Sequence, residues 1–311
     1  MKLKNKESLR KLFKQIYRGR QLYLLLALPL IYLIIFSYVP MAGVQIAFRD
    51  YTFKGGIWGS EWVGLKHFTK FLSSYQFMTT LMNTLRVSIY TLTVTTFLPI
   101  FLALALNCLN NVGLKKTIQT LTYLPHFISV VVLIGMLTQM LNPIIGVYGN
   151  IVRSITGERA KDLLGMASAF PHLYVWSGVW QNTGFNSIIY IAALAGSDQD
   201  LHEAAQIDGA TRLQRVRYID IPCIIPTAVI LLILNAGKVM SVGFEKVFLL
   251  QNSLNLTHSE VISTYVYKQA FGTGSNFSYS TAIGLFNSVI NLFLIVMVNK
   301  ISKKVSDSSL W

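Results

Sequence analysis

Charged residues are scarce in this sequence: they make up 13% of its 311 residues, whereas hydrophobic residues make up 53%. A soluble domain carries about 25% charged residues, because its surface must stay in contact with water. A soluble protein of this length would need a polar surface that this composition does not supply. The composition therefore argues against a soluble protein and predicts a chain that is surrounded by lipid.

The sequence also lacks the motifs of several common chemistries. Its only two cysteines, Cys108 and Cys223, have no CxxC spacing, which argues against a disulfide framework or a metal site and favours a packing role. No GxxxxGKS/T phosphate-binding loop is present, and Gly113–Thr117 has a Lys and a Thr near a glycine at the wrong spacing. We therefore expect no ATP hydrolysis, no metal and no cofactor in this chain itself.

Six long apolar stretches are the main positive signal. A helix needs about 20 largely apolar residues to cross the hydrocarbon core. Hydropathy predicts six transmembrane helices at about 21–39, 83–107, 117–140, 170–195, 223–243 and 279–299. No small-x-small cleavage site follows the first stretch, so we expect a retained helix instead of a signal peptide. The expected fold is an all-α integral membrane protein with one transmembrane domain over 21–299.

The Lys and Arg residues predict which side faces the cytoplasm. With both termini inside, the inner segments hold 16 of the 27 Lys and Arg residues and the outer segments hold 9. Inner loops of membrane proteins carry such an excess. The basic segment 1–20 and the tail 300–311 are therefore predicted to be cytoplasmic. The net charge of +14 does not indicate nucleic acid, because the positive residues flank apolar stretches.

The inner loop 197–222 has the local pattern of two short helices joined at a sharp bend. Asp200 and Glu203 have the spacing of an N-cap and its N3 partner, which predicts a helix start. Gly209 can take the left-handed conformation that ends a helix. Thr211 and Gln214 repeat the capping-box spacing and start a second helix, which Pro222 is expected to end. Small residues between the two helices would let a partner protein approach the backbone closely.

This loop resembles the EAA loop of ABC importer permeases. The similarity lies in Glu203-Ala-Ala205, Gly209, Ile219 and Pro222 at this spacing, between two membrane helices on the positive side. In that family the loop forms a coupling helix that sits in a cleft of a cytoplasmic ATPase. The resemblance implies that ATPase coupling involves Glu203, Ala204, Ala205, Asp208, Gly209, Ala210 and Thr211.

Other segments across nearly the whole chain resemble the LplB-type carbohydrate permeases. They include Tyr38–Phe48, Trp58–Leu65, Tyr123–Ile128 and Val242–Glu245. The resemblance implies a type I importer (MetI-like) fold in a bacterial cell membrane, with half of the pathway for an oligosaccharide. It also implies a second related permease subunit, an extracellular solute-binding protein, and an ATPase dimer that holds the ATP and magnesium.

Polar side chains inside the predicted helices are the candidates for substrate contact, because such groups are costly in lipid unless they face a cavity or a partner. A sugar needs hydrogen-bonding groups and aromatic faces, so Trp180 and Asn186 are the preferred pair. The full set of candidates is Trp180, Asn182, Asn186, Asn235, Lys238 and Asn287. Each one alone is more often a helix–helix contact or an interface anchor, and we expect one or two true contacts in the set.

Lys238 is unusual because it falls late in the fifth predicted helix. It could meet an acidic sugar such as a uronate, or its side chain could snorkel to the outer surface, which is the preferred interpretation.

Two other functions compete with the oligosaccharide importer. The same architecture could import a peptide or an amino acid, and the residues alone do not distinguish these solutes. An ion-coupled secondary transporter is less favoured, because it should show acidic residues within the membrane, and the six apolar stretches contain none.

Overall fold

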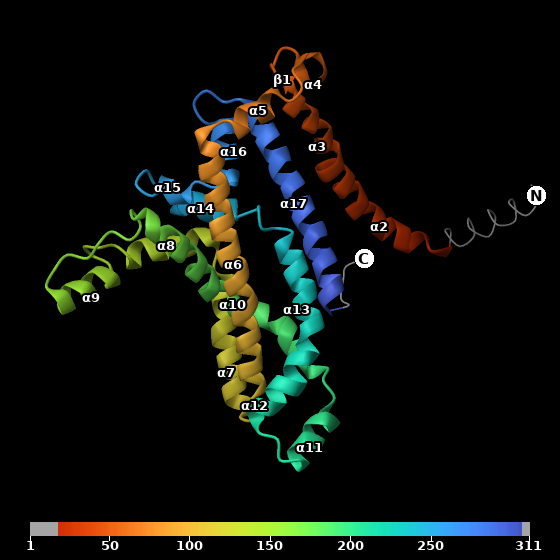
Figure 1. The fold of residues 1–311 in the computed structure, drawn as a ribbon, viewed down its shortest axis with the longest axis vertical. Helices are drawn as coiled ribbons and strands as arrows, with labels where there is room; N and C mark the ends of the chain where they lie inside the picture. Colours follow the sequence, from red (N-terminus) through yellow and green to blue (C-terminus); the bar gives the residue numbers. More distant parts are fainter. Residues whose placement is uncertain (1–17, 307–311) are drawn as a thin grey trace, which may run out of the picture.

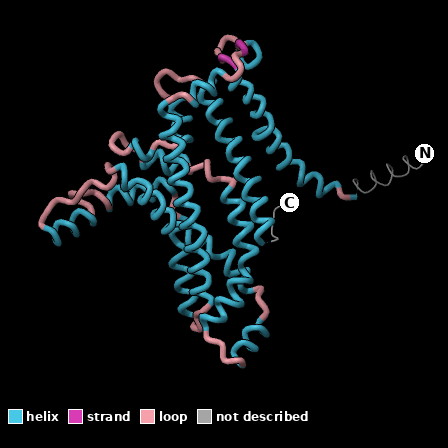
Figure 2. The backbone as a smooth tube through the Cα atoms, viewed as in Figure 1, coloured by secondary structure: helices cyan, strands magenta, loops and turns pink. Residues whose placement is uncertain are grey.

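The computed structural model describes residues 18–306, and these residues are almost entirely helical (Figures 1 and 2). Residues 1–17 of the predicted cytoplasmic segment 1–20 lie outside the described residues. So do residues 307–311 of the predicted tail 300–311. Four helical segments are long and apolar enough to cross a membrane, and a bent helix pair is a possible fifth. These four are Arg20–Phe48, Tyr75–Asn107, Arg212–Ala236 and Phe277–Lys303.

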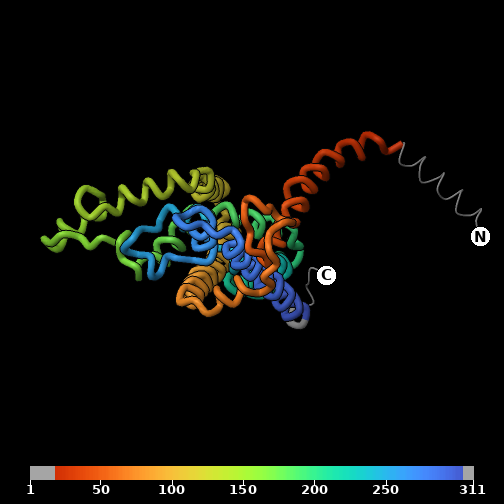
Figure 3. Tube along the Cα trace, turned by 90° about the horizontal axis from the view of Figure 1, so that it is seen from above, coloured from red at the N-terminus to blue at the C-terminus, as the bar shows by residue number. Residues whose placement is uncertain are grey.

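The first membrane helix is longer than the predicted 21–39. Its beginning stands apart from the bundle, whereas its last part, Ala42–Phe48, packs against α17 (Phe277–Ser306). It runs through α2 (Arg20–Leu33), a π-helical turn (Ile34–Tyr38), α3 (Val39–Met41) and a 3-10 helix (Ala42–Phe48). The most apolar window of this segment has no buried residue. α2 leans away from the bundle on one side, while α8 (Val130–Met140) and α9 (Val147–Thr156) extend on the other (Figures 1 and 3). Its apolar surface is therefore available to lipid or to another protein.

The centre of the bundle is built from α6 (Tyr75–Asn107), α10 (Phe170–Ala195), α13 (Ile221–Ala236) and α17 (Phe277–Ser306). α10 occupies the predicted range 170–195, yet it is not among the segments apolar enough to be candidate spans. Its sequence carries Gln181, Asn182 and Asn186 along with two tryptophans. This helix with its polar side chains packs against α6.

The third predicted helix, 117–140, is wrong as a single helix. The structure has α7 (Val112–Tyr123) with a 3-10 turn (Leu124–Phe127), then α8 (Val130–Met140), bent by 99°. Pro125 lies in the 3-10 turn, and the Ser129 side chain caps α8 by accepting from Val132 N–H. The Gln181 side-chain amide of α10 donates to Ile128 O at 2.7 Å, so the carbonyl at the break keeps a partner.

The fifth predicted helix, 223–243, also needs correction at both ends. α12 (Arg212–Arg215) continues through a π-helical turn (Val216–Asp220) into α13, so Pro222 does not end the helix. Proline is tolerated there because it occupies the first turn of α13 and its missing N–H falls beside the π-helical turn. At the other end α13 stops at Ala236 and the chain turns over Gly237–Met240.

Short elements cover both ends of the bundle. At one end lie the antiparallel pair β1 (Arg49–Asp50) and β2 (Glu61–Trp62) with α4 (Gly56–Gly59) and α5 (Lys66–Leu72) (Figure 1). α9 (Val147–Thr156) and a 3-10 turn (Ala167–Ala169) precede α10, and α14 (Phe244–Leu250), α15 (Leu256–Ser259) and α16 (Ile262–Phe271) precede α17. At the opposite end lies α11 (Gln199–Ile207) (Figure 1).

Apolar packing holds α14 inside the bundle. One core cluster joins Val87 of α6, Ile134 of α8, Val175 of α10 and Val247 of α14. Val247 is fully buried, and full burial of such a side chain stabilises by about 1.5–3 kcal/mol. This packing fixes α14 beside α10, and that position determines the lining of the cavity described below.

Candidate functional site

The coupling loop, residues 197–222, forms two short helices as predicted, but its first cap differs. α11 begins after Asp198, whose side chain accepts from Asp200 N–H at 3.0 Å. Asp200 was predicted to be the N-cap on its spacing to Glu203, and the structure places it inside the first turn. The capping-box spacing favours Asp200, because the residue three after Asp198 is Leu201, but the extended backbone of Asp198 places the cap there.

The bend of the coupling loop depends on Gly209. Its φ is +75°, in the left-handed region, and a Cβ added there would meet no atom within 4 Å. Thr211 follows as the N-cap of α12 in a full capping box with Gln214. The bend therefore has a defined backbone geometry, and the space beside it is open.

The face of the coupling loop is exposed and partly apolar. Ile207 is 87% exposed and Leu213 is 78% exposed. The predicted coupling residues Glu203, Ala204, Asp208, Gly209 and Thr211 are exposed, and Ala205 and Ala210 are half-buried. Large apolar side chains that project together from a short loop are typical of a surface that binds another protein.

A buried polar cluster ties the coupling loop to two membrane helices. Asp220, only 3% exposed, lies 3.4 Å from His202 Nε2 of α11 and accepts from Asn107 Nδ2 of α6 at 3.2 Å. Arg215 also lines the small cavity of about 100 Å³ at this position. Because a carboxylate buried this deeply needs its partners, we expect a movement of α11 to be transmitted to α6 and to α13.

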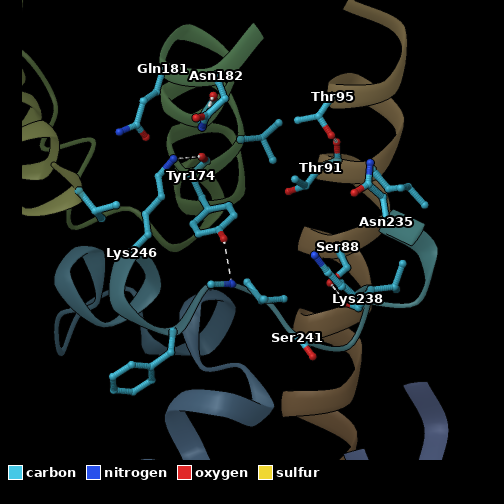
Figure 4. Close-up of a pocket in the computed structure, with 18 of the residues that line it drawn as sticks. Ser88, Thr91, Thr95, Tyr174, Gln181, Asn182, Asn235, Lys238, Ser241 and Lys246 are labelled. Carbon is cyan, nitrogen blue, oxygen red and sulfur yellow. Dashed lines mark hydrogen bonds between the residues drawn. The ribbon is translucent and has the colours of Figure 1, made fainter. Parts of the chain in front are cut away.

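A polar cavity lies between α6, α10 and the chain from α13 to α14 (Figure 4). Its volume is about 510 Å³. Hydroxyls line one wall, and side-chain amides and two lysines line the others. The polar lining consists of Ser88, Thr91, Thr95, Tyr174, Gln181, Asn182, Asn186, Asn235, Lys238, Ser241, Glu245 and Lys246. A dense set of hydrogen-bonding groups of this kind suits a polyhydroxylated ligand.

The structure brings together four of the six predicted substrate candidates. Asn182, Asn186, Asn235 and Lys238 all line the cavity. Trp180, although 51% exposed, is not in the lining, so the predicted pairing of Trp180 with Asn186 around one substrate is not formed within this chain. Asn287 is also outside the cavity; its Oδ1 is buried without a hydrogen-bond partner among the described residues.

Lys238 does not lie within a membrane helix. It follows the end of α13 at Ala236, and its backbone forms a turn in which its N–H donates to Asn235 O. Its exposed side chain reaches the cavity beside Ser88 (Figure 4). The predicted position of Lys238 within the fifth helix is therefore wrong, because the helix stops before the lysine.

Lys246 is the cavity residue that the sequence analysis missed. It is 9% exposed, its ammonium donates to Tyr174 O at 2.8 Å, and it lies 4.9 Å from the Tyr174 ring centre. Burial lowers the pKa of Lys246, in the short helix α14 outside the candidate spans, to about 8. A Cβ at Gly178 would lie 3.0 Å from the ammonium, so the glycine leaves it room. Hydropathy leaves Lys246 in a predicted outer loop, because α14 is too short to stand out in a hydropathy window.

A helical membrane bundle with a polar central cavity and an exposed two-helix loop at one end defines a transport protein of the membrane. The chain belongs to the family of binding-protein-dependent transport system inner membrane components, whose sequence profile matches residues 20–307. The expected membership of the ABC importer permeases and the MetI-like fold are thus confirmed.

Similar proteins are known in sequence and structure. The chain is 40% identical to Protein LplB of Bacillus subtilis (strain 168) over 94% of its own length and 92% of that protein's. It is 39% identical to the polygalacturonan/rhamnogalacturonan transport system permease protein YteP of the same organism, with 98% and 95% covered. A bacterial ABC transporter involved in the import of the acidic polysaccharide alginate has a chain with a TM-score of 0.87 and 36% identity, covering 95% of this chain and 99% of that one.

Proposed function

We propose that this chain forms half of the translocation pathway of an ABC importer for an oligosaccharide. The observation that carries the proposal is the cavity of about 510 Å³ between α6, α10 and α14, whose walls combine hydroxyls and side-chain amides. Sugar hydroxyls both donate and accept hydrogen bonds, and these groups match them. The named substrates of similar proteins, polygalacturonan, rhamnogalacturonan and alginate, support a carbohydrate over a peptide.

The energy for transport is proposed to come from a separate cytoplasmic ATPase dimer that binds ATP and magnesium. The coupling loop offers this partner an open backbone at Gly209 and exposed apolar side chains at Ile207 and Leu213. Closure of the ATPases would move α11 as a rigid unit. The contacts of Asp220 with His202 and Asn107 would pass this movement to α13 and α6, which flank the cavity.

Two further partners complete the proposed importer. A solved alginate transporter similar to this chain is in complex with a periplasmic protein that carries an alginate pentasaccharide, which supports an extracellular solute-binding protein here. The apolar segment Arg20–Phe48, whose most apolar window has no buried residue, supports a second, related permease subunit in the membrane. The cavity of this chain would then be one wall of a pathway shared by two subunits.

A mild-detergent purification tests the assembly. The chain is tagged in its host and every co-purifying protein is identified. We expect an ATPase and a second permease subunit of the same family. A chain that purifies alone, or only with copies of itself, would contradict the proposed assembly.

A further inference from the structure

The cavity holds a buried positive charge that no acidic group among the described residues 18–306 offsets by contact. Lys246 is bonded to neutral groups only, the carbonyl and ring of Tyr174. Among the described residues no carboxylate lies within ion-pair distance of its ammonium. A desolvated cation is costly unless it is paired, so its presence at a cavity wall indicates an anionic ligand.

A second lysine faces the same cavity from another side. Lys238 stands on the turn after α13, beside Ser88, whereas Lys246 rises from α14 beside α10 (Figure 4). Lys238 likewise has no ion pair among the residues that the structure describes. The two ammonium groups thus come from different elements, with the hydroxyls and amides of the lining between them.

The acidic residue in the lining does not cancel this charge. Glu245 precedes Lys246 in α14 and its side chain is exposed. It forms no ion pair with either lysine in the described part of the chain. The lining therefore carries two cations and one anion, and the most deeply buried charge of the three is the Lys246 ammonium.

We infer that the oligosaccharide carried through this cavity is anionic, and that Lys246 and Lys238 bind carboxylates of its uronate units while the amides and hydroxyls bind the ring hydroxyls. The inference rests on the proposed function and narrows its substrate class. A Lys ammonium donates three hydrogen bonds and pairs with a carboxylate as a point charge. Lys246 acts as the fixed contact, because its hydrogen bond to Tyr174 O holds the ammonium in the space that Gly178 leaves open. Lys238, on an exposed turn, acts as the adaptable one.

Uptake by intact cells tests the inference. The whole importer is expressed in cells that lack it, with the wild-type chain, Lys246→Gln, Lys238→Gln or the double variant. The probes are labelled uronate oligosaccharides and the same oligosaccharides after reduction of their carboxyl groups, which removes the charge and keeps the backbone. Gln at position 246 keeps an N–H donor, so the substitution removes the charge and retains a polar side chain of similar shape.

We expect the wild type to take up uronate oligosaccharides in preference to the reduced forms, and the double variant to lose at least about tenfold of this uptake. The control Lys161→Gln, at an exposed position outside the cavity, should transport as the wild type does. The amount of each variant in the membrane is measured by immunoblot. If the double variant is poorly inserted, the exposed Lys238→Gln and the preference of the wild type between the two probes carry the test.

Two results would overturn the inference and leave the proposed function standing. One is uptake of the reduced probes as fast as the uronates by the wild type. The other is a well-inserted double variant that imports uronates at the wild-type rate. Uptake of neither class by the wild type would instead count against the proposed function itself.

Discussion

Replacement of Gly209 by Val tests how the coupling loop works. At a φ of +75° a residue with a Cβ costs about 1–2 kcal/mol relative to glycine. No atom lies within 4 Å of the added Cβ, so the chain itself has no clash. If the loop relaxes to relieve this strain, docking must restore the bend, which weakens ATPase binding by about 5- to 30-fold. The new side chain also stands on the docking surface and adds to this loss.

Gly157 provides a matched control for this change. It ends α9 with a φ of +73°, and a Cβ there would also meet nothing within 4 Å. Gly157→Val therefore carries the same backbone strain in a segment far along the chain from the coupling loop. Gly209→Asn separates strain from bulk, because asparagine tolerates the left-handed region.

The assay measures how much ATPase co-purifies with each variant and how fast the cells take up oligosaccharide. We expect Gly209→Val to lose most of both while its level in the membrane matches that of Gly157→Val. Gly209→Asn should fall between the wild type and the valine variant. Equal ATPase retention by Gly209→Val and Gly157→Val would refute the role of this bend.

Three further predictions concern other parts of the chain. Asp220→Ala should keep the ATPase bound but lower the uptake per ATP hydrolysed, because α11 loses its contact with α6; the exposed Asp200→Ala serves as control. Gly184→Ala should lower the free energy of unfolding of the purified chain by about 1–3 kcal/mol, because a Cβ there would clash with the Thr122 carbonyl. Gly284→Ala has open space around the added Cβ and should change the stability little. Raising the pH through about 8 neutralises Lys246, so uptake of uronates by the wild type should decline on the alkaline side and uptake by Lys246→Gln should remain flat. The other ionisable groups of the cavity are Lys238, Glu245 and Tyr174, and all three remain in the variant.

Much of the coupling loop could be predicted because its geometry is local. The left-handed Gly209 and the Thr211 capping box depend on a few neighbouring residues, and both form as expected. The long apolar helices were likewise predictable from composition. The boundaries were less so: hydropathy does not detect a bend such as the one at Ile128, because the residues on both sides of the break are apolar.

The cavity was only partly predictable because its lining depends on packing between distant segments. Asn182 and Asn186 could be nominated as polar groups in an apolar helix. Hydropathy could not show that Trp180 is outside the lining of the cavity to which Asn186 belongs. Lys246 reaches the cavity only because Val247 anchors α14 against α8 and α10, and no pattern within the loop indicates that contact.

Reconstitution of the purified importer in lipid vesicles tests the central claim most directly. Labelled oligosaccharide and solute-binding protein are placed on one side, and ATP with magnesium is placed on the side of the ATPase. The account predicts accumulation that requires ATP and the ATPase and that persists when ion gradients are abolished. Accumulation driven by a proton or sodium gradient through this chain without the ATPase would contradict it.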